Sequence, residues 1–124
     1  MVVGYADAER ADRIFHALAD GTRRDIVALV LRGEHSVSDI ARRYPMSVAA
    51  VQKHVVVLER AGLIVKHRRG REQRVSGNVD TLRDAHGLLD QLEAVWRARI
   101  DRIGVILADP TEPDPTEPDP TEGA

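Results

Sequence analysis

The fold of this chain is decided by residues 36–62, which read SVSDIARRYPMSVAAVQKHVVVLERAG. Ser36 and Asp39 have the spacing of a capping box, in which a serine begins a helix and an acidic side chain follows three residues later. The spacing predicts a short helix that begins at this serine. That helix must end near Tyr44, because Pro45 disfavours helical geometry in the residue before it.

A longer helix is predicted directly after the proline. Ser47 can cap a helix over residues 48–61, and Gly62 is well placed to end it. One face of this helix is apolar and is expected to point inward; it consists of Val51, Val55 and Leu58. A short helix, a turn of a few residues and a longer helix in this order form a helix-turn-helix pattern.

The residues that follow predict a β-hairpin. Residues 63–69 are rich in β-branched side chains and then become basic, and residues 72–76 form a second short stretch of the same kind. Gly70 lies between them, where a tight turn is needed. We therefore expect a mainly α fold of the α+β class, a winged helix-turn-helix with a two-stranded β wing.

Two helices are predicted before this region. An apolar stripe indicates a first helix over about residues 6–19, and Asp20 can cap a second helix that Gly33 stops. The stripe of the first helix consists of Ala8, Ala11, Ile14, Phe15 and Leu18, and that of the second consists of Ile26, Leu29 and Val30.

A final helix of about 26 residues is predicted to begin at Asn78 or Asp80. Its apolar seam consists of Leu82, Ala85, Leu89, Leu92, Trp96, Ile100, Ile103 and Leu107. The spacing is helical throughout, and the seam is longer than a core of this size requires. We therefore expect a helical interface between two copies of the chain, formed by Ile14, Phe15, Leu89, Leu92, Trp96, Ile100 and Ile103.

The net charge of −2 conceals an uneven distribution. Residues 1–108 carry 18 basic and 14 acidic side chains, whereas residues 109–124 carry six acids and no base. Within the first part, residues 42–74 alone have a net charge of +7. A basic block inside a folded domain indicates a polyanionic partner, and the plain alternative is a solvated face.

Two regions are therefore expected, a winged helix-turn-helix DNA-binding and dimerisation domain over residues 1–108 and a tail over residues 109–124. The tail repeats the motif DPTEP with a period of five residues. Proline removes backbone donors and the acids repel one another, so a disordered, extended tail is predicted. It is either a solvated spacer or a transient cover for the basic face.

The composition excludes several classes of function. The chain has no cysteine, which excludes disulfides, thiolate metal sites and a cysteine nucleophile. Aromatic residues make up 3% of the chain, too few for reading single strands by base stacking. No phosphate loop or hydrolase motif is present, and the five histidines share no motif, so no enzyme and no cofactor are expected. Without a signal peptide or a membrane span, a cytoplasmic protein is expected.

The chain resembles the ArsR-type winged-helix repressors over roughly residues 7–105. The resemblance is carried by three stretches in order, which are residues 18–24 (LADGTRR), 47–55 (SVAAVQKHV) and 58–64 (LERAGLI). The wing RGREQR over residues 69–74 and the segment VWRARIDRI over residues 95–103 are similar to a branch often encoded beside START-like proteins related to the Hsp90 ATPase activator. The resemblance implies a homodimeric repressor that acts on a palindromic double-stranded DNA operator, and regulation of its own gene is a further expectation.

Two departures from the family pattern concern the second helix and metal sensing. Gly21 replaces a frequent proline, which should leave the cap intact and loosen the first turn. Metal-sensing members carry Cys-Val-Cys in the third helix, and the matching positions here are Ser36, Val37 and Ser38. Serine is a poor ligand for soft metals. Asp84 and His86 match half of a second family site, whose later positions are Arg97 and Ile100, so no metal site is predicted and these two remain weak candidates.

The geometry of recognition helices and the resemblance together predict the DNA-binding residues. Gln52 can pair with adenine, Lys53 with guanine or a phosphate, and Ala49 with a thymine methyl group. Ser47 combines capping with a phosphate contact, whereas His54 either contacts a phosphate or packs at the helix edge as a neutral imidazole. Further phosphate or minor-groove contacts are expected from Arg42, Arg43, Arg68, Arg69, Arg71 and Arg74.

Two other readings of the function stay open at this point. A winged helix can also bind proteins, since a fold does not fix a function. A repressor could also respond to a metal or small ligand at a site that the sequence does not reveal.

Overall fold

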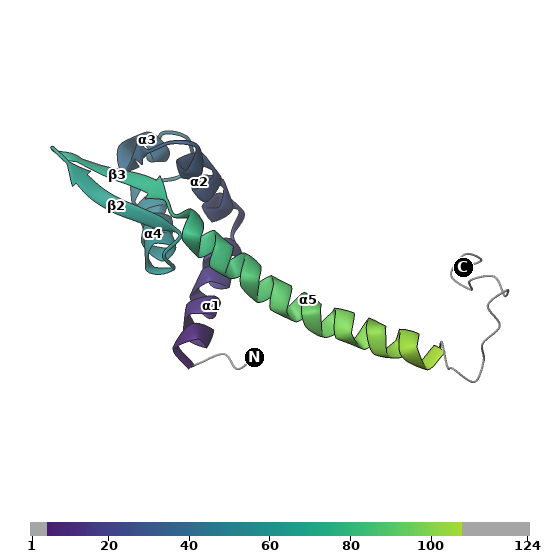
Figure 1. Ribbon diagram of the computed structural model, residues 1–124. Coiled ribbons are helices and arrows are strands. Elements are labelled where there is room, and N and C mark those ends of the chain that lie inside the picture. Colours follow the sequence, from purple (N-terminus) through teal and green to yellow (C-terminus); the bar gives the residue numbers. More distant parts are fainter. Residues whose placement is uncertain (1–4, 108–124) are drawn as a thin grey trace. The chain divides into compact units, whose positions relative to one another are not determined.

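The computed structural model describes residues 5–107 and divides the chain into two compact units, residues 1–88 and residues 89–124. The first unit contains four helices, a three-stranded sheet and the beginning of a fifth helix (Figure 1). The second unit contains the rest of that fifth helix. The predicted tail over residues 109–124 lies outside the described residues.

The helices follow the predicted order, with small differences at their ends. They are α1 (Tyr5–Leu18), α2 (Gly21–Arg32), α3 (Val37–Ala41), α4 (Val48–Arg60) and α5 (Val79–Leu107). The last helix, α5, begins at Val79, between the two predicted starts at Asn78 and Asp80, and the Asn78 side chain accepts a hydrogen bond from the Asp80 N–H at 3.1 Å.

The strands form a sheet with one more member than predicted. β2 (Ile64–Arg69) and β3 (Glu72–Gly77) make the expected hairpin, and β1 (His35–Ser36) pairs with the other edge of β3. All pairings are antiparallel, in the order β1-β3-β2. The predicted fold, a mainly helical winged helix-turn-helix with a two-stranded wing, is confirmed, and β1 is a short addition to it.

Side-chain caps fix the starts of three helices. Asp20, Ser36 and Ser47 each accept a hydrogen bond at 3.0 Å from the backbone N–H three residues later. These bonds satisfy donors that the first turn of a helix leaves free. The caps of α2, α3 and α4 are therefore as predicted, and Gly21 leaves the first of them intact.

The core lies between the helices of the first unit and the sheet. Its fully buried members include Ile26, Ile40, Val51, Leu58, Leu63 and Val75. The inward face predicted for α4 is thus confirmed. Every buried side-chain nitrogen and oxygen atom in the described part of the chain has a hydrogen-bond partner.

One predicted interface residue belongs to the interior instead. Ile14 on α1 is fully buried within the chain. It has no surface left for a second copy, which corrects the prediction for this residue. The neighbouring Phe15 keeps 38% of its surface exposed and remains available.

Candidate nucleic-acid interface

Helix α4 presents a polar edge on the side opposite its buried face. Ala49, Gln52 and Lys53 are exposed, while Val51 and Val55 lie in the core. Since residues three or four apart share a helix face, the first two turns hold the exposed side chains on one edge. The Ser47 cap fixes the backbone where this edge begins.

His54 faces the start of α2. Its Nδ1 lies 3.2 Å from Arg23 Nη1 and 4.0 Å from the Asp20 carboxylate. Arg23 also donates from its Nε to the Ala17 carbonyl at 2.8 Å. The imidazole therefore joins α4 to the α1–α2 junction, an arrangement that favours the packing alternative for this residue over the phosphate contact.

The carboxylate at this junction is stabilised in its ionised form. The Arg23 backbone N–H donates to Asp20 and, as the main cause, lowers the pKa of this carboxyl group. Desolvation opposes this lowering as the second-largest effect, and the positive charge of Arg23 adds a smaller effect that lowers the pKa. The start of α2 is thus fixed by a charged cap that also faces α4.

The wing has a basic tip. Strands β2 and β3 are joined by a two-residue turn at Gly70 and Arg71, and Gly70 has φ +64°, a conformation that favours glycine. Arg68 and Arg71 are exposed and form no ion pair with any described residue. These two side chains are free to reach an external anion.

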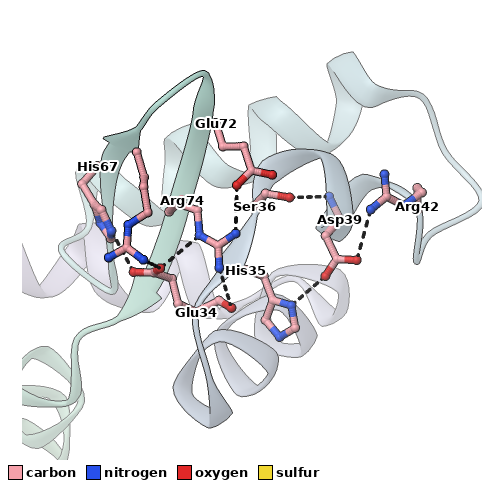
Figure 2. Close-up of polar contacts among 9 residues, drawn as sticks. Glu34, His35, Ser36, Asp39, Arg42, His67, Glu72 and Arg74 are labelled. Atoms are coloured by element: carbon pink, nitrogen blue, oxygen red, sulfur yellow. Dashed lines mark hydrogen bonds and ion pairs between the residues drawn. The ribbon is translucent and has the colours of Figure 1, made fainter.

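Arg74 forms its polar contacts within the sheet region. It lies at the centre of the sheet, opposite Ser36 on β1 and His67 on β2. Its Nε donates to Glu34 Oε1 at 3.0 Å and its Nη1 donates to Glu72 Oε1 at 3.1 Å (Figure 2). The side chain is only 24% exposed. Arg74 is therefore already bound by two carboxylates within the chain.

Glu34 is the residue of this region that sequence reasoning missed. Its Oε2 lies 2.7 Å from His67 Nε2, and its Oε1 lies 3.9 Å from Arg69 Nη1. The hydrogen bond from Arg74 is the main cause of a lowered pKa of the Glu34 carboxyl group. A prediction of strand β1 would have revealed this contact, because the pairing of β1 with β3 brings Glu34 beside Arg74.

Arg42 and Arg43 share one acidic partner. Their guanidinium groups lie 3.4 Å and 3.6 Å from the Asp39 carboxylate, which also contacts His35 Nδ1 at 2.7 Å. The contact with His35 is the main cause of a lowered pKa of Asp39. Both arginine side chains remain exposed, and exposed pairs of this length contribute little free energy. They can leave Asp39 for a stronger anion.

A hollow separates α4 from the wing. Its volume is about 250 Å³, and it is lined by Val37, Gln52, Val55, Val56, Lys66 and Gln73. Lys66 Nζ lies 3.4 Å from Glu59 Oε1, which links β2 to α4 below the polar edge. The hollow leaves Gln52 of the helix and Gln73 of the wing facing a common space.

One of the two weak metal candidates is paired within the chain. The Asp84 carboxylate forms an ion pair with Arg10 Nη2 at 2.7 Å. Within residues 5–107, no three histidine, cysteine or acidic side chains come close enough to hold a metal ion. In the same range no helix combines the length and the apolar character needed to cross a bilayer.

Comparisons with known proteins agree with this geometry. A family model described as a helix-turn-helix domain matches residues 18–67. The chain is 32% identical over 74 residues to the transcriptional repressor SdpR of Bacillus subtilis, a match that covers 60% of this chain and 82% of the relative. It is 47% identical over 53 residues to an HTH-type transcriptional regulator of Mycobacterium tuberculosis, covering 43% of this chain and 50% of the relative.

Solved structures show the same fold. An ArsR-like transcriptional regulator from Rhodococcus superposes with a TM-score of 0.72 at 31% identity, covering 80% of this chain and 93% of that one. A second structure is the homodimeric winged helix-turn-helix DNA-binding domain of a possible ArsR-family regulator from Mycobacterium bovis. It superposes with a TM-score of 0.59 at 29% identity, covering 72% of this chain and 82% of that one. With its helix-turn-helix, its basic wing and these relatives, the chain belongs to the ArsR family of winged helix-turn-helix DNA-binding transcriptional regulators.

Proposed function

We propose that this regulator is a homodimeric repressor that binds a two-fold symmetric operator through α4 and the wing. The observation that carries the proposal is the exposed edge of Ala49, Gln52 and Lys53, which lies on the capped, well-packed helix α4. The same unit carries a wing tip with unpaired arginines. A helix edge of this kind reads bases in the major groove, and a basic hairpin holds the backbone or the minor groove.

Each exposed side chain has a role that follows from its chemistry. Gln52 carries an amide that matches the two hydrogen-bonding groups of adenine, and Lys53 donates to guanine or a phosphate. Ala49 is small enough to contact a thymine methyl group, and the Ser47 hydroxyl can donate to a phosphate. The phosphate contacts come from exposed arginines, which are Arg42, Arg43, Arg68, Arg69 and Arg71.

The second copy is proposed to bind along α5. Leu89, Leu92, Trp96, Ile100 and Ile103 are between 40% and 68% exposed, which is unusual for large apolar side chains on one helix face. Phe15 of α1 adds a further exposed ring. The structure of the related domain from Mycobacterium bovis is homodimeric, which supports the same state here.

The branch and the setting are also proposals. The wing RGREQR and the segment over residues 95–103 support the branch encoded beside START-like proteins. We propose that the repressor acts in the cytoplasm and on its own promoter. A START-like gene next to this one would support the branch, and a different neighbour would count against it.

Selection of DNA from a random duplex library tests the function directly. The full chain should enrich a sequence with two-fold symmetric half-sites, separated by about one helical turn or a multiple of it. Binding to the enriched duplex should weaken steeply as salt rises, because each phosphate contact releases counterions. Enrichment of no sequence, or affinity without salt dependence, would overturn the proposal.

A further inference from the structure

One cationic side chain of the wing is held within the chain. Arg74 is bound by the carboxylate of Glu34, which precedes strand β1, and His67 Nε2 lies 2.7 Å from the same carboxylate (Figure 2). We propose that Glu34 is a specificity-determining residue that withholds Arg74 from DNA phosphates. Sequence-independent contacts by the wing are then left to its exposed arginines, Arg68, Arg69 and Arg71. This inference rests on the proposed function.

The contacts of Arg74 explain why a phosphate does not displace Glu34. Arg74 donates to a Glu34 carboxylate oxygen at 3.0 Å, to the Glu34 backbone carbonyl at 3.5 Å and to Glu72 at 3.1 Å. A charge-assisted bond is stronger than a neutral one, and the three acceptors hold the guanidinium in one orientation. A phosphate would have to replace all of them.

The exposure of the partners supports the same conclusion. The side chains of Glu34 and Arg74 are 25% and 24% exposed, so their interaction is less screened by water and salt than a surface pair. Arg42 and Arg43 differ in this respect, because each has a single longer contact and a more exposed side chain. These two arginines can turn to a phosphate, whereas Arg74 cannot do so without leaving Glu34.

The consequence is a lower affinity for DNA of any sequence. Each cation that neutralises a phosphate steepens the dependence of log affinity on log salt by about 0.9. Non-specific sites compete with the operator, so cations that contact every sequence reduce discrimination. By binding Arg74, Glu34 leaves a larger share of the binding energy to the base-reading edge of α4.

A merely structural role for Glu34 predicts the opposite sign. If the carboxylate served only to tie the wing to the end of α2, its loss would loosen the hairpin. Affinity for every DNA would then fall, and the salt slope would stay the same or become shallower. The proposed role predicts higher affinity for random DNA and a steeper slope, so the two roles are separated by one titration.

The experiment compares full-length Glu34→Gln with the wild type on a random-sequence duplex and on a duplex from the selection. Glu34→Gln should steepen the slope on random DNA by about 0.9. When salt rises from about 50 to 200 mM, the affinity of Glu34→Gln for random DNA should fall about three- to fourfold more than that of the wild type for each cation released from Glu34. The ratio of selected to random affinity should fall.

Two further variants control for charge and identify the released cation. Glu93→Gln makes the same change of charge at an exposed ion pair with Arg97 on α5 and should leave the slope on random DNA unchanged. Adding Arg74→Gln to Glu34→Gln should return the slope toward the wild-type value by about 0.9. The return would assign the gain to Arg74.

Arg74→Gln alone keeps the test decisive even if Glu34→Gln fails to fold. Since Arg74 is withheld from DNA, Arg74→Gln alone should leave the salt slope unchanged. If Arg74 contacted a phosphate, the same variant would make the slope shallower by about 0.9. A slope that is unchanged in Glu34→Gln, or shallower in Arg74→Gln alone, overturns the inference and leaves the proposed function standing. A wild type that shows no salt-dependent DNA binding overturns both.

Discussion

Gly77 at the end of β3 lies so close to Leu31 on α2 that a Cβ atom added at Gly77 would be 2.6 Å from Leu31 Cδ2. It would also be 3.2 Å from the Leu31 Cα atom. Only a residue without a side chain allows the strand and the helix to approach this closely. The contact fixes the base of the wing, because Gly77 pairs with Ile64 where the hairpin leaves the core.

Replacing Gly77 with alanine should therefore destabilise the fold. We expect Gly77→Ala to lower the free energy of unfolding by about 1–3 kcal/mol, the usual cost of overpacking. Adding Leu31→Ala should restore part of the loss, because the nearest clashing atoms belong to that side chain. Denaturant unfolding measures both.

Gly33→Ala is the matched control for this comparison. A Cβ at Gly33 would meet no atom within 4 Å, and its φ of 173° is an extended conformation open to any residue. It should change the free energy of unfolding by about 0.5 kcal/mol or less. Equal losses in Gly33→Ala and Gly77→Ala would show that the close approach has no energetic consequence.

Two single variants should distinguish recognition of bases by α4 from binding of the DNA backbone by the wing. Gln52→Ala should lower discrimination between the selected duplex and a mismatched one by about 1–3 kcal/mol, because it removes a bidentate contact. Arg71→Ala should weaken binding to all sequences alike and reduce the salt slope by about one. Mobility-shift titrations at several salt concentrations measure both quantities.

Glu9→Gln on α1 offers a control outside the proposed interface for these titrations. Its side chain is exposed, and the substitution keeps its size. Neither discrimination nor the slope should change. Unaltered operator affinity in both Gln52→Ala and Arg71→Ala would show that α4 and the wing tip do not contact the DNA.

The success of the sequence prediction for the helices has a local cause. The starts of α2, α3 and α4 depend on Asp20, Ser36 and Ser47, whose side chains bond only three residues ahead. The exposed edge of α4 follows in the same way from helical spacing. Signals of this kind are fully contained in a short stretch of sequence.

The misses depend on contacts distant in sequence. Strand β1 has two residues, too few to show a pattern, and exists because of its pairing with β3. Without that strand, nothing predicted that Glu34 would meet Arg74, a residue 40 positions later. Ile14 and Phe15 lie on one predicted stripe, and only the packing of α1 on its neighbours decides which of them is buried.

Acid should destabilise the fold in part through Asp39. The bond with His35 is the main cause of a pKa of Asp39 below its ordinary value of 3.8, so the folded protein favours the ionised form. Its contribution is fully present above this ordinary value and is lost as the pH falls through the lower pKa of the folded state. The Glu34 pKa is lowered in the same sense from 4.5, mainly by Arg74.

Asp39→Asn should reduce the loss of folding stability that Asp39 causes at acidic pH. Unfolding measured from about pH 6 downward should show a smaller loss of stability below about pH 4 than in the wild type, because asparagine has no proton to gain there. Glu93→Gln, at an exposed pair on α5, tests for a general effect of charge. Parallel curves for the wild type and Asp39→Asn would contradict the role of this carboxylate.

The apolar face of α5 should hold two copies together, and a charge on it should separate them. Trp96 is the single tryptophan of the chain and is 55% exposed. We expect Trp96→Glu to turn the dimer into a monomer in sedimentation equilibrium, because an unpaired carboxylate would be buried in the interface. Affinity for a two-half-site operator should fall with it.

Val105→Glu gives the matched control for the face of the helix. At about 100° per residue, Val105 lies opposite the row of Trp96, Ile100 and Ile103, although it is just as apolar and 71% exposed. This variant should remain a dimer.

In the wild type, the emission of Trp96 should shift to longer wavelength on dilution, because dissociation returns the indole to water. A dimer that survives Trp96→Glu, with emission that does not change on dilution, would show that this face is not the interface.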